Sequence, residues 1–250
     1  MNRIVACLDG STCDAAVERT ADALASLLRA TVDAVNVSRP GDATTIERPE
    51  RARVLSGDPA SVLLDELRAD DVVLGVIGSR SVRAKPAMAG HVAMELLASS
   101  PVPLAVVAPG GASMPADHPE ILIPLDGAVE TTDAVAPLAN ALASGGAGVV
   151  FLHVFDSGSV PPFVSSADDL AILAEEFLDR HLPERTEPCE LRLGEPGDHI
   201  ADVADARDAD AIMVAWRQDL SPGRAEVIRH LVRRDRRPLI VVPIPQSTRA

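Results

Sequence analysis

The sequence predicts an α/β protein built from two similar halves, each with a mainly parallel sheet flanked by helices. Short runs of Val, Ile and Leu alternate with helix-like segments, a pattern typical of strand–helix–strand units. Gly or Pro bounds most of these runs, as at the ends of buried strands. The order of segments between residues 4 and 107 returns between residues 121 and 243, which indicates an internal duplication.

The first copy begins with a strand-like run that ends at Asp9 and continues into a segment whose apolar residues recur at three-and-four spacing. Gly57-Asp58-Pro59 precedes a shorter helix-like segment, and residues 38–52 are polar and broken by Pro, as expected for a loop. The predicted strands are residues 4–8, 32–37, 53–55, 72–77 and 104–107, and the predicted helices are residues 14–28, 60–68 and 92–99.

The second copy repeats this plan with one insertion. The offset between the copies grows from 117 residues, Asp9 to Asp126, to 137 residues, Gly57 to Gly194, so 20 residues are inserted. They contain a predicted amphipathic helix over residues 166–182. Residues 110–119, rich in Gly, Ala, Ser and Pro, predict a linker between a first domain, residues 1–109, and a second domain, residues 120–246.

Composition narrows the classes of function. The net charge of −14 opposes binding to nucleic acid or to anionic lipid, and a content of 2% aromatic residues without tyrosine opposes stacking on bases. The three cysteines have no CxxC spacing, which is typical of buried or idle thiols in a reducing compartment. Neither a signal peptide nor an apolar run of about 18 residues is present, so we expect a cytoplasmic protein with no membrane partner.

Several short motifs, met twice in the same order, resemble the universal stress protein family. They are a strand ending in Asp9-Gly10-Ser11, the Gly57-Asp58-Pro59 turn, a glycine-bearing loop over residues 78–90, and a closing strand after Pro101-Val102-Pro103. The resemblance covers nearly the whole chain as a tandem pair. It implies two Rossmann-like domains of the adenine nucleotide alpha hydrolase-like type, each with a five-stranded parallel sheet. It also implies that the domains pair through their last strands, residues 104–107 and 239–242; association of two chains into a homodimer is left open.

A candidate site lies where the strands of the first copy end. In open parallel sheets, ligands bind beyond the carboxyl ends of the strands, at the point where the strand order reverses. Asp9 follows the first strand, Val37 ends the second and Gly78 ends the fourth. We expect the Asp9 carboxylate to accept hydrogen bonds from a ribose or a base edge, and Val37 to form an apolar wall. The backbone amides after Gly78 are then placed to face phosphates.

The resemblance implies the remaining residues of a nucleotide site. Members that bind ATP or another adenine nucleotide carry Gly, two residues, Gly, nine residues, Gly, and then Ser or Thr. Gly78 matches the first glycine, and Ser81 stands at the second. Gly90 matches the third in a loop one residue shorter, followed by His91 in place of the hydroxyl residue. The predicted site comprises Asp9, Gly10, Val37, Gly78, Ser79, Arg80, Ser81, Gly90 and His91.

The second copy departs further from this pattern. Ala215 and Gln218 occupy the first two glycine positions, and Trp216 adds bulk where a phosphate would pass. The predicted, weaker second site comprises Asp126, Val154, Arg217, Gly223 and Arg224. We therefore expect the first copy to be the ligand domain and the second copy to be structural.

Most of these residues also have a structural interpretation. Asp9 and Asp126 are candidates for the N-cap of the following helix. His91 is a candidate for a surface or cap histidine, and His153 for a core histidine with its hydrogen bond satisfied. Trp216 is a candidate for a packing anchor between the two domains.

The expected function is a non-enzymatic stress-response or regulatory protein, with ATP or another adenine nucleotide as ligand in the first copy. No catalytic residue and no metal site is predicted, because the sequence has no Gly-x-Ser-x-Gly elbow, no Walker lysine pattern and no metal-ligand spacing of histidines. One alternative is a nucleotide-free interaction scaffold of the same fold. A second alternative is a weak ATPase.

Overall fold

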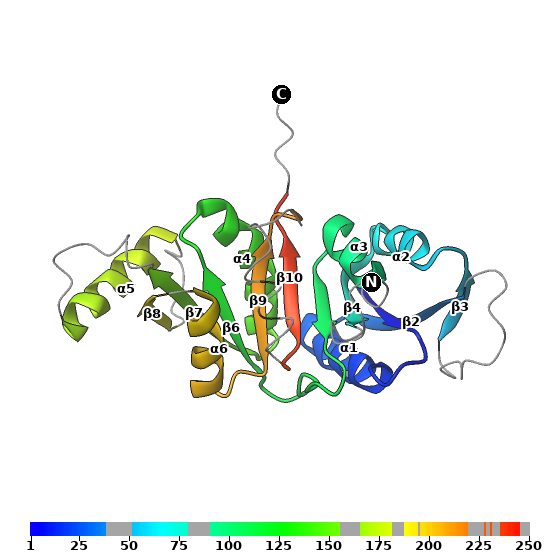
Figure 1. Cartoon of the computed structure of the whole chain (residues 1–250), viewed down its shortest axis with the longest axis horizontal. Helices are drawn as coiled ribbons and strands as arrows, with labels where there is room; N and C mark the ends of the chain where they lie inside the picture. The colour runs from blue at the N-terminus through cyan, green and yellow to red at the C-terminus, as the bar shows by residue number, and fades with distance from the viewer. Residues whose placement is uncertain are drawn as a thin grey trace, which may run out of the picture.

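The computed structural model describes residues 1–38, 52–79, 91–155, 166–181, 188–194, 196–219, 228, 231 and 236–245. Ten strands form one sheet in the order β3-β2-β1-β4-β5-β10-β9-β6-β7-β8. In Figure 1 the first half of the chain, in blue and cyan, lies on one side of β10, and the second half lies on the other. Each half therefore has five strands in the same order, and the predicted fold class is confirmed.

Among the described residues, the elements of the two halves follow the same order, with one inserted helix in the second half; the position equivalent to α3, between β9 and β10, lies largely outside the described residues. The first half contains β1 (Arg3–Leu8), α1 (Asp14–Leu28), β2 (Thr31–Ser38), β3 (Arg53–Ser56), α2 (Pro59–Leu67), β4 (Val72–Gly78), α3 (His91–Ser99) and β5 (Leu104–Val107). The second half contains β6 (Glu120–Leu125), α4 (Val129–Ser144), β7 (Gly148–Phe155), α5 (Ala167–His181), β8 (Cys189–Leu193), α6 (Pro196–Ala206), β9 (Ala211–Trp216) and β10 (Leu239–Pro243). The inserted helix predicted over residues 166–182 is α5.

The two halves meet at the pair β5–β10. These strands run antiparallel with Leu239 opposite Val106 and Val241 opposite Leu104, whereas the other neighbouring strands that the structure describes are parallel. They are the two strands through which the family resemblance implies pairing. The junction turns two five-stranded sheets into one continuous sheet.

Alternate residues of each strand point to opposite faces of the sheet and build two apolar cores. One core packs beneath α1 and α4 and contains both Leu24 and Leu142, and the other packs beneath α2, α3 and α6 and contains both Leu97 and Trp216. Each core thus includes side chains from both halves. The two halves share their interior across the junction.

The predicted linker is packed against the protein. The Ala112 amide donates to the Arg236 carbonyl at 2.9 Å, and the Met114 amide donates to Thr20 Oγ1 at 3.3 Å. The Met114 side chain is fully buried. The predicted linker is therefore an ordered connection that packs against α1. Among the described residues, no helix is long and apolar enough to cross a membrane.

Candidate functional site at the carboxyl ends of the strands

The structure brings four of the predicted residues of the first half, Asp9, Gly10, Val37 and Gly78, to one edge of the sheet. Leu8 pairs with Asn36, and Cys7 pairs with Ile77, so β1, β2 and β4 end side by side. Asp9 and Gly10 are exposed beyond β1, and Val37 is half-buried near the end of β2. The strand order reverses between β1 and β4, which is where ligands bind in sheets of this kind.

The turn after β1 is held by two carboxylates. Asp9 Oδ1 accepts a hydrogen bond from the Ser11 amide at 3.0 Å. The Asp14 carboxylate accepts the amides of Asp9 at 3.2 Å and Gly10 at 2.9 Å. Burial raises the pKa of Asp14, although these two amide donors act in the opposite direction. Gly10 has a φ of 77°, so the turn uses a conformation that glycine adopts readily.

The same turn recurs after β6, where Asp126 Oδ1 accepts the Ala128 amide at 2.9 Å and Gly127 has a φ of 82°. The N-cap residues of α1 and α4 are Cys13 and Ala128. Neither aspartate is therefore the N-cap residue, which corrects the capping interpretation. Each instead closes a short turn, in which its carboxylate accepts the backbone amide two residues further along the chain.

Gly78 and Ser79 have structural partners at the end of β4. A Cβ atom on Gly78 would lie 2.9 Å from Cys13 Cβ, so this glycine lets the first turn of α1 approach the strand. The Ser79 amide donates to the Val107 carbonyl at 2.8 Å, and its side chain is buried. This amide is thus engaged by β5, and any phosphate contact has to use other donors.

Five of the predicted residues lie outside the described residues: Arg80, Ser81, Gly90, Gly223 and Arg224. Two others, His91 and Arg217, lie at the surface. His91 is exposed at the start of α3, with Nε2 3.4 Å from Glu95 Oε2, which agrees with the surface interpretation. Arg217 Nη2 lies 4.0 Å from Glu130 Oε2 at the surface of the second half.

In the second half, the equivalent edge is occupied by the protein's own aromatic side chains. His153 is buried, and its Nδ1 donates to the Leu125 carbonyl at 2.8 Å. The Phe177 ring from α5 stacks on the His153 ring with centroids 4.4 Å apart, and Phe155 meets it edge-on. A Cβ on Gly127 would lie 3.4 Å from His153 and 3.7 Å from Phe177. The core interpretation of His153 is confirmed.

The first half carries an amide where the second half carries this histidine. Asn36 Nδ2 donates to the Leu8 carbonyl at 2.9 Å, as His153 does to the Leu125 carbonyl. The two side chains thus play the same part at equivalent positions, and Val154, the neighbour of His153, is half-buried like Val37. Above His153, the inserted α5 of the second half supplies the Phe177 ring, and among the described residues no aromatic ring contact is found at Asn36.

Two contacts between the halves add residues that the glycine pattern alone could not reveal. Trp216 Nε1 donates to the Leu97 carbonyl at 3.0 Å, and Gln218 Nε2 donates to the Ser100 carbonyl at 2.8 Å. Trp216 is buried, so its interpretation as a packing anchor is confirmed. In the sequence, the only indication of this contact was a single tryptophan, Trp216, next to the position equivalent to the first loop glycine.

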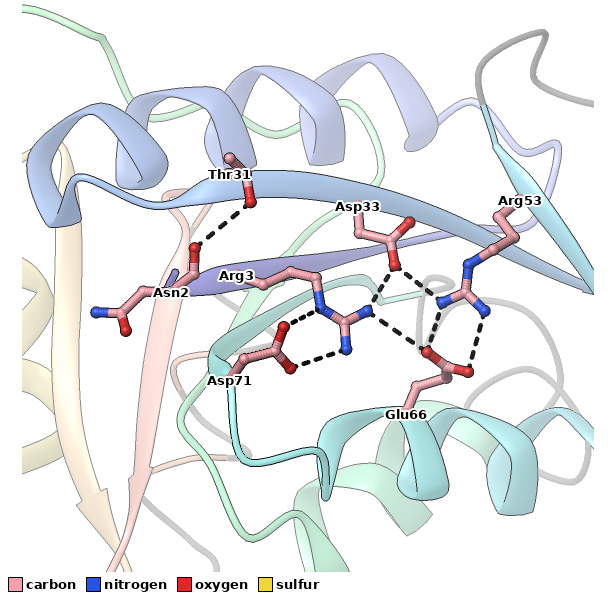
Figure 2. A network of polar contacts seen from close by, with 7 residues as sticks. All are labelled: Asn2, Arg3, Thr31, Asp33, Arg53, Glu66 and Asp71. Carbon is pink, nitrogen blue, oxygen red and sulfur yellow. Dashed lines mark hydrogen bonds and ion pairs between the residues drawn. The ribbon is translucent and has the colours of Figure 1, made fainter.

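A network of charged residues lies at the opposite, amino-terminal edge of the first half (Figure 2). Arg3 reaches Asp33 at 2.6 Å and Asp71 at 3.1 Å, and Arg53 reaches Asp33 at 2.9 Å and Glu66 at 2.5 Å. Burial disfavours the charged form of Asp33, but hydrogen bonds from Arg53 and Arg3 outweigh it and lower its pKa. The network connects β1, β2, β3 and α2, and we assign it a structural role.

The described residues contain no group of three or more His, Cys, Asp or Glu side chains able to hold a metal ion. Burial, with a smaller contribution from Glu66, raises the pKa of the Cys7 thiol to about 12, and burial together with Glu190 raises that of Cys189 to about 11. Both thiols are therefore protonated at neutral pH and are poor nucleophiles.

The comparisons with known proteins agree with this architecture. The family model of the universal stress protein family matches residues 119–243, which is half of the chain. A universal stress protein from Archaeoglobus fulgidus has a similar structure, with a TM-score of 0.69 and 14% identity, over 98% of this chain and 97% of that chain. No curated protein shows significant similarity.

A protein of unknown function from Pseudomonas aeruginosa also has a similar structure, with a TM-score of 0.64 and 12% identity, over 98% of this chain and 93% of that chain. At these identities the likeness shows the fold, and both matches span the two halves together. The family match over the second half, repeated in structure by the first, shows that this chain belongs to the universal stress protein family.

Proposed function

We propose that this chain is a regulatory, non-enzymatic stress-response protein that binds an adenine nucleotide in its first half only. The binding site is the edge formed by the ends of β1, β2 and β4, with Asp9 and Val37 as its central residues. The second half serves as its structural partner. The family, the reversal of strand order between β1 and β4, and the exposure of Asp9 and Gly10 support this proposal.

The difference between the equivalent edges is the observation that carries the proposal. In the second half, the Phe177 ring stacks on His153, Phe155 meets His153 edge-on, and Phe177 lies against Gly127. A planar base would have to displace the Phe177 ring to stack at that position. In the first half, the residue equivalent to His153 is Asn36, whose amide is held by the Leu8 carbonyl.

The chemistry of the first-half edge suits a nucleoside. The Asp9 carboxylate accepts hydrogen bonds, as needed to hold ribose hydroxyls or an exocyclic amine. Val37 provides an apolar surface next to it. The predicted phosphate-binding residues Arg80 and Ser81 follow Ser79 directly in the chain, at the end of β4.

A nucleotide-free scaffold is the second candidate, and specific contacts favour it. Gly78 has a packing role against Cys13, and the Ser79 amide is bound to Val107. Trp216, at the end of β9 in the second half, is used as a contact between the halves. These uses of the former glycine-loop positions need no ligand.

Titration calorimetry with ATP and with cyclic AMP distinguishes the two candidates. We expect one site per chain, and we expect Asp9→Ala to weaken binding about tenfold, the effect of losing one charged hydrogen bond. Asp126→Ala is the matched control, because Asp126 closes the same turn in the second half. It should leave the affinity unchanged.

Each other outcome of the titration has a defined meaning. Absence of heat with both nucleotides, from folded protein, would remove the nucleotide proposal and leave the scaffold. Equal losses in both aspartate variants would contradict binding in the first half only, because Asp126 lies in the second half.

A further inference from the structure

The end of α3 is held by side chains from the other half of the chain. Trp216 Nε1 donates to the Leu97 carbonyl at 3.0 Å, and Gln218 Nε2 donates to the Ser100 carbonyl at 2.8 Å. The Trp216 side chain, 5% exposed, belongs to the same apolar core as Leu96 and Leu97. These bonds join residues that lie 119 and 118 positions apart.

These contacts satisfy groups that a helix cannot satisfy by itself. The last carbonyls of an α-helix have no partner within the helix, and an unpaired buried carbonyl is costly. At the end of α3, the Leu96 carbonyl accepts the Ser100 amide at 2.8 Å. The carbonyl of Leu97, in the last turn of α3, accepts from Trp216, and the carbonyl of Ser100, directly after the helix, accepts from Gln218. The second half thus supplies the C-terminal cap of a helix in the first half.

The donors come from a rigid position in the second half. Trp216 ends β9, where it pairs with Pro243 of β10, and its carbonyl accepts the Ile244 amide at 2.8 Å. Arg217, which lies between the two donors, extends instead toward Glu130 of its own half. Gln218 has a φ of 58°, which turns the chain so that two residues of the three face α3.

We propose that Trp216 and Gln218 form an interdomain clamp that sets the order of α3 and through it the affinity of the nucleotide site in the first half. Leu96 and Leu97 of α3 belong to the same apolar core as Trp216, and Val37 of the proposed site packs against that core. The helix therefore shares its packing with both the clamp and the proposed site. Trp216 and Gln218 are positioning residues, and the part of the proposal that concerns affinity rests on the proposed function.

Hydrogen exchange of α3 tests the clamp without any ligand. We expect Gln218→Ala and Trp216→Phe each to speed exchange of the α3 amides about fivefold, the effect of one lost hydrogen bond. Trp216→Phe keeps an aromatic ring in the core and removes the donor. Arg217→Ala, the intervening residue, should leave α3 unchanged, and α1 on the opposite face should be unchanged in all three variants.

Unchanged exchange of α3 in both folded clamp variants would overturn the proposal, as would an equal increase in Arg217→Ala. Trp216 is the only tryptophan and tyrosine is absent, so its emission reports on the clamp directly. We expect the emission of Gln218→Ala to shift to longer wavelength. An emission spectrum identical to that of the unmodified protein would contradict the proposal that Gln218 and Trp216 act together as one clamp.

The affinity of Gln218→Ala for ATP tests the regulatory part of the proposal, namely that the clamp sets the affinity of the nucleotide site. Because coupling is reciprocal, we expect about fivefold weaker binding in this variant and a change of Trp216 emission on adding ATP to the unmodified protein. Equal affinities, with Trp216 emission insensitive to ATP, would overturn the regulatory part and leave the proposed function intact. Absence of ATP binding would overturn the proposed function and the regulatory part together, whereas hydrogen exchange would still decide the clamp.

Discussion

Asp33 is the residue that joins the two arginines of the amino-terminal network. It accepts from Arg3 at 2.6 Å and from Arg53 at 2.9 Å, and Glu66 and Asp71 complete the set. Arg53 is the first residue of β3, the outermost strand of the first half. The ion pairs therefore fasten an edge strand, which is mostly exposed, to the adjacent strand and to α2.

We predict that Asp33→Asn lowers the free energy of unfolding by about 1–2 kcal/mol near neutral pH, because two charged hydrogen bonds to partly exposed groups are lost. The pKa of Asp33 is lower in the folded protein than in the unfolded chain. Its contribution is therefore complete above the normal carboxyl range and is lost as the pH falls through the lowered value. Urea unfolding of both proteins should show the difference shrinking from about pH 7 to about pH 3.

Asp65→Asn is the control for this prediction, since Asp65 pairs with Arg68 in an exposed contact between neighbours on α2. We expect it to change the stability by less than about 0.5 kcal/mol. A difference for Asp33→Asn that stays constant or grows at acidic pH would contradict the role of its ionised form.

At the scale of elements, the two halves also pack closely where α4 ends against α1. A Cβ on Gly145, the C-cap residue of α4, would lie 2.2 Å from the Leu27 carbonyl oxygen. Gly145 has a φ of −82°, a conformation that any residue adopts. Glycine is therefore required here by the neighbouring helix and not by its own backbone.

We predict that Gly145→Ala lowers the free energy of unfolding by about 1–3 kcal/mol, the cost of forcing an atom into a packed interface. If Leu27 were not packed against Gly145, the same change would stabilise the protein by about 0.4–1 kcal/mol at this φ. The sign of the change in stability therefore tests the packing. Thermal and urea unfolding measure it. Ala141→Ser, at an exposed position on α4, should have little effect, and a Gly145→Ala protein of unchanged or higher stability would contradict this packing.

Helices and strands could be predicted from the sequence where the spacing of apolar residues shows which face is buried. The strands, α1, and α5 in the insertion all appear close to the predicted residues. Partners at a distance could not be predicted in this way. The burial of Met114 in the linker and the hydrogen bond from Trp216 to Leu97 depend on how the halves dock.

At the scale of the whole molecule, the duplication explains why the location of the candidate site could be predicted from the sequence and why its accessibility could not. Carboxyl ends of parallel strands share an edge, so Asp9, Val37 and Gly78 were expected together and lie together. Whether an edge accepts a ligand depends on what covers it. Phe177 covers the second edge because an inserted helix folds back onto His153, and the repeat pattern does not contain that information.

The molecule thus consists of two similar halves that share one sheet and two cores but differ at equivalent edges. The most direct test of this asymmetry is a crystal structure of the protein grown in saturating ATP. The account predicts nucleotide density beside Asp9, with Phe177 still stacked on His153. Density beside Asp126 in place of the Phe177 ring, or density in neither half, would contradict it.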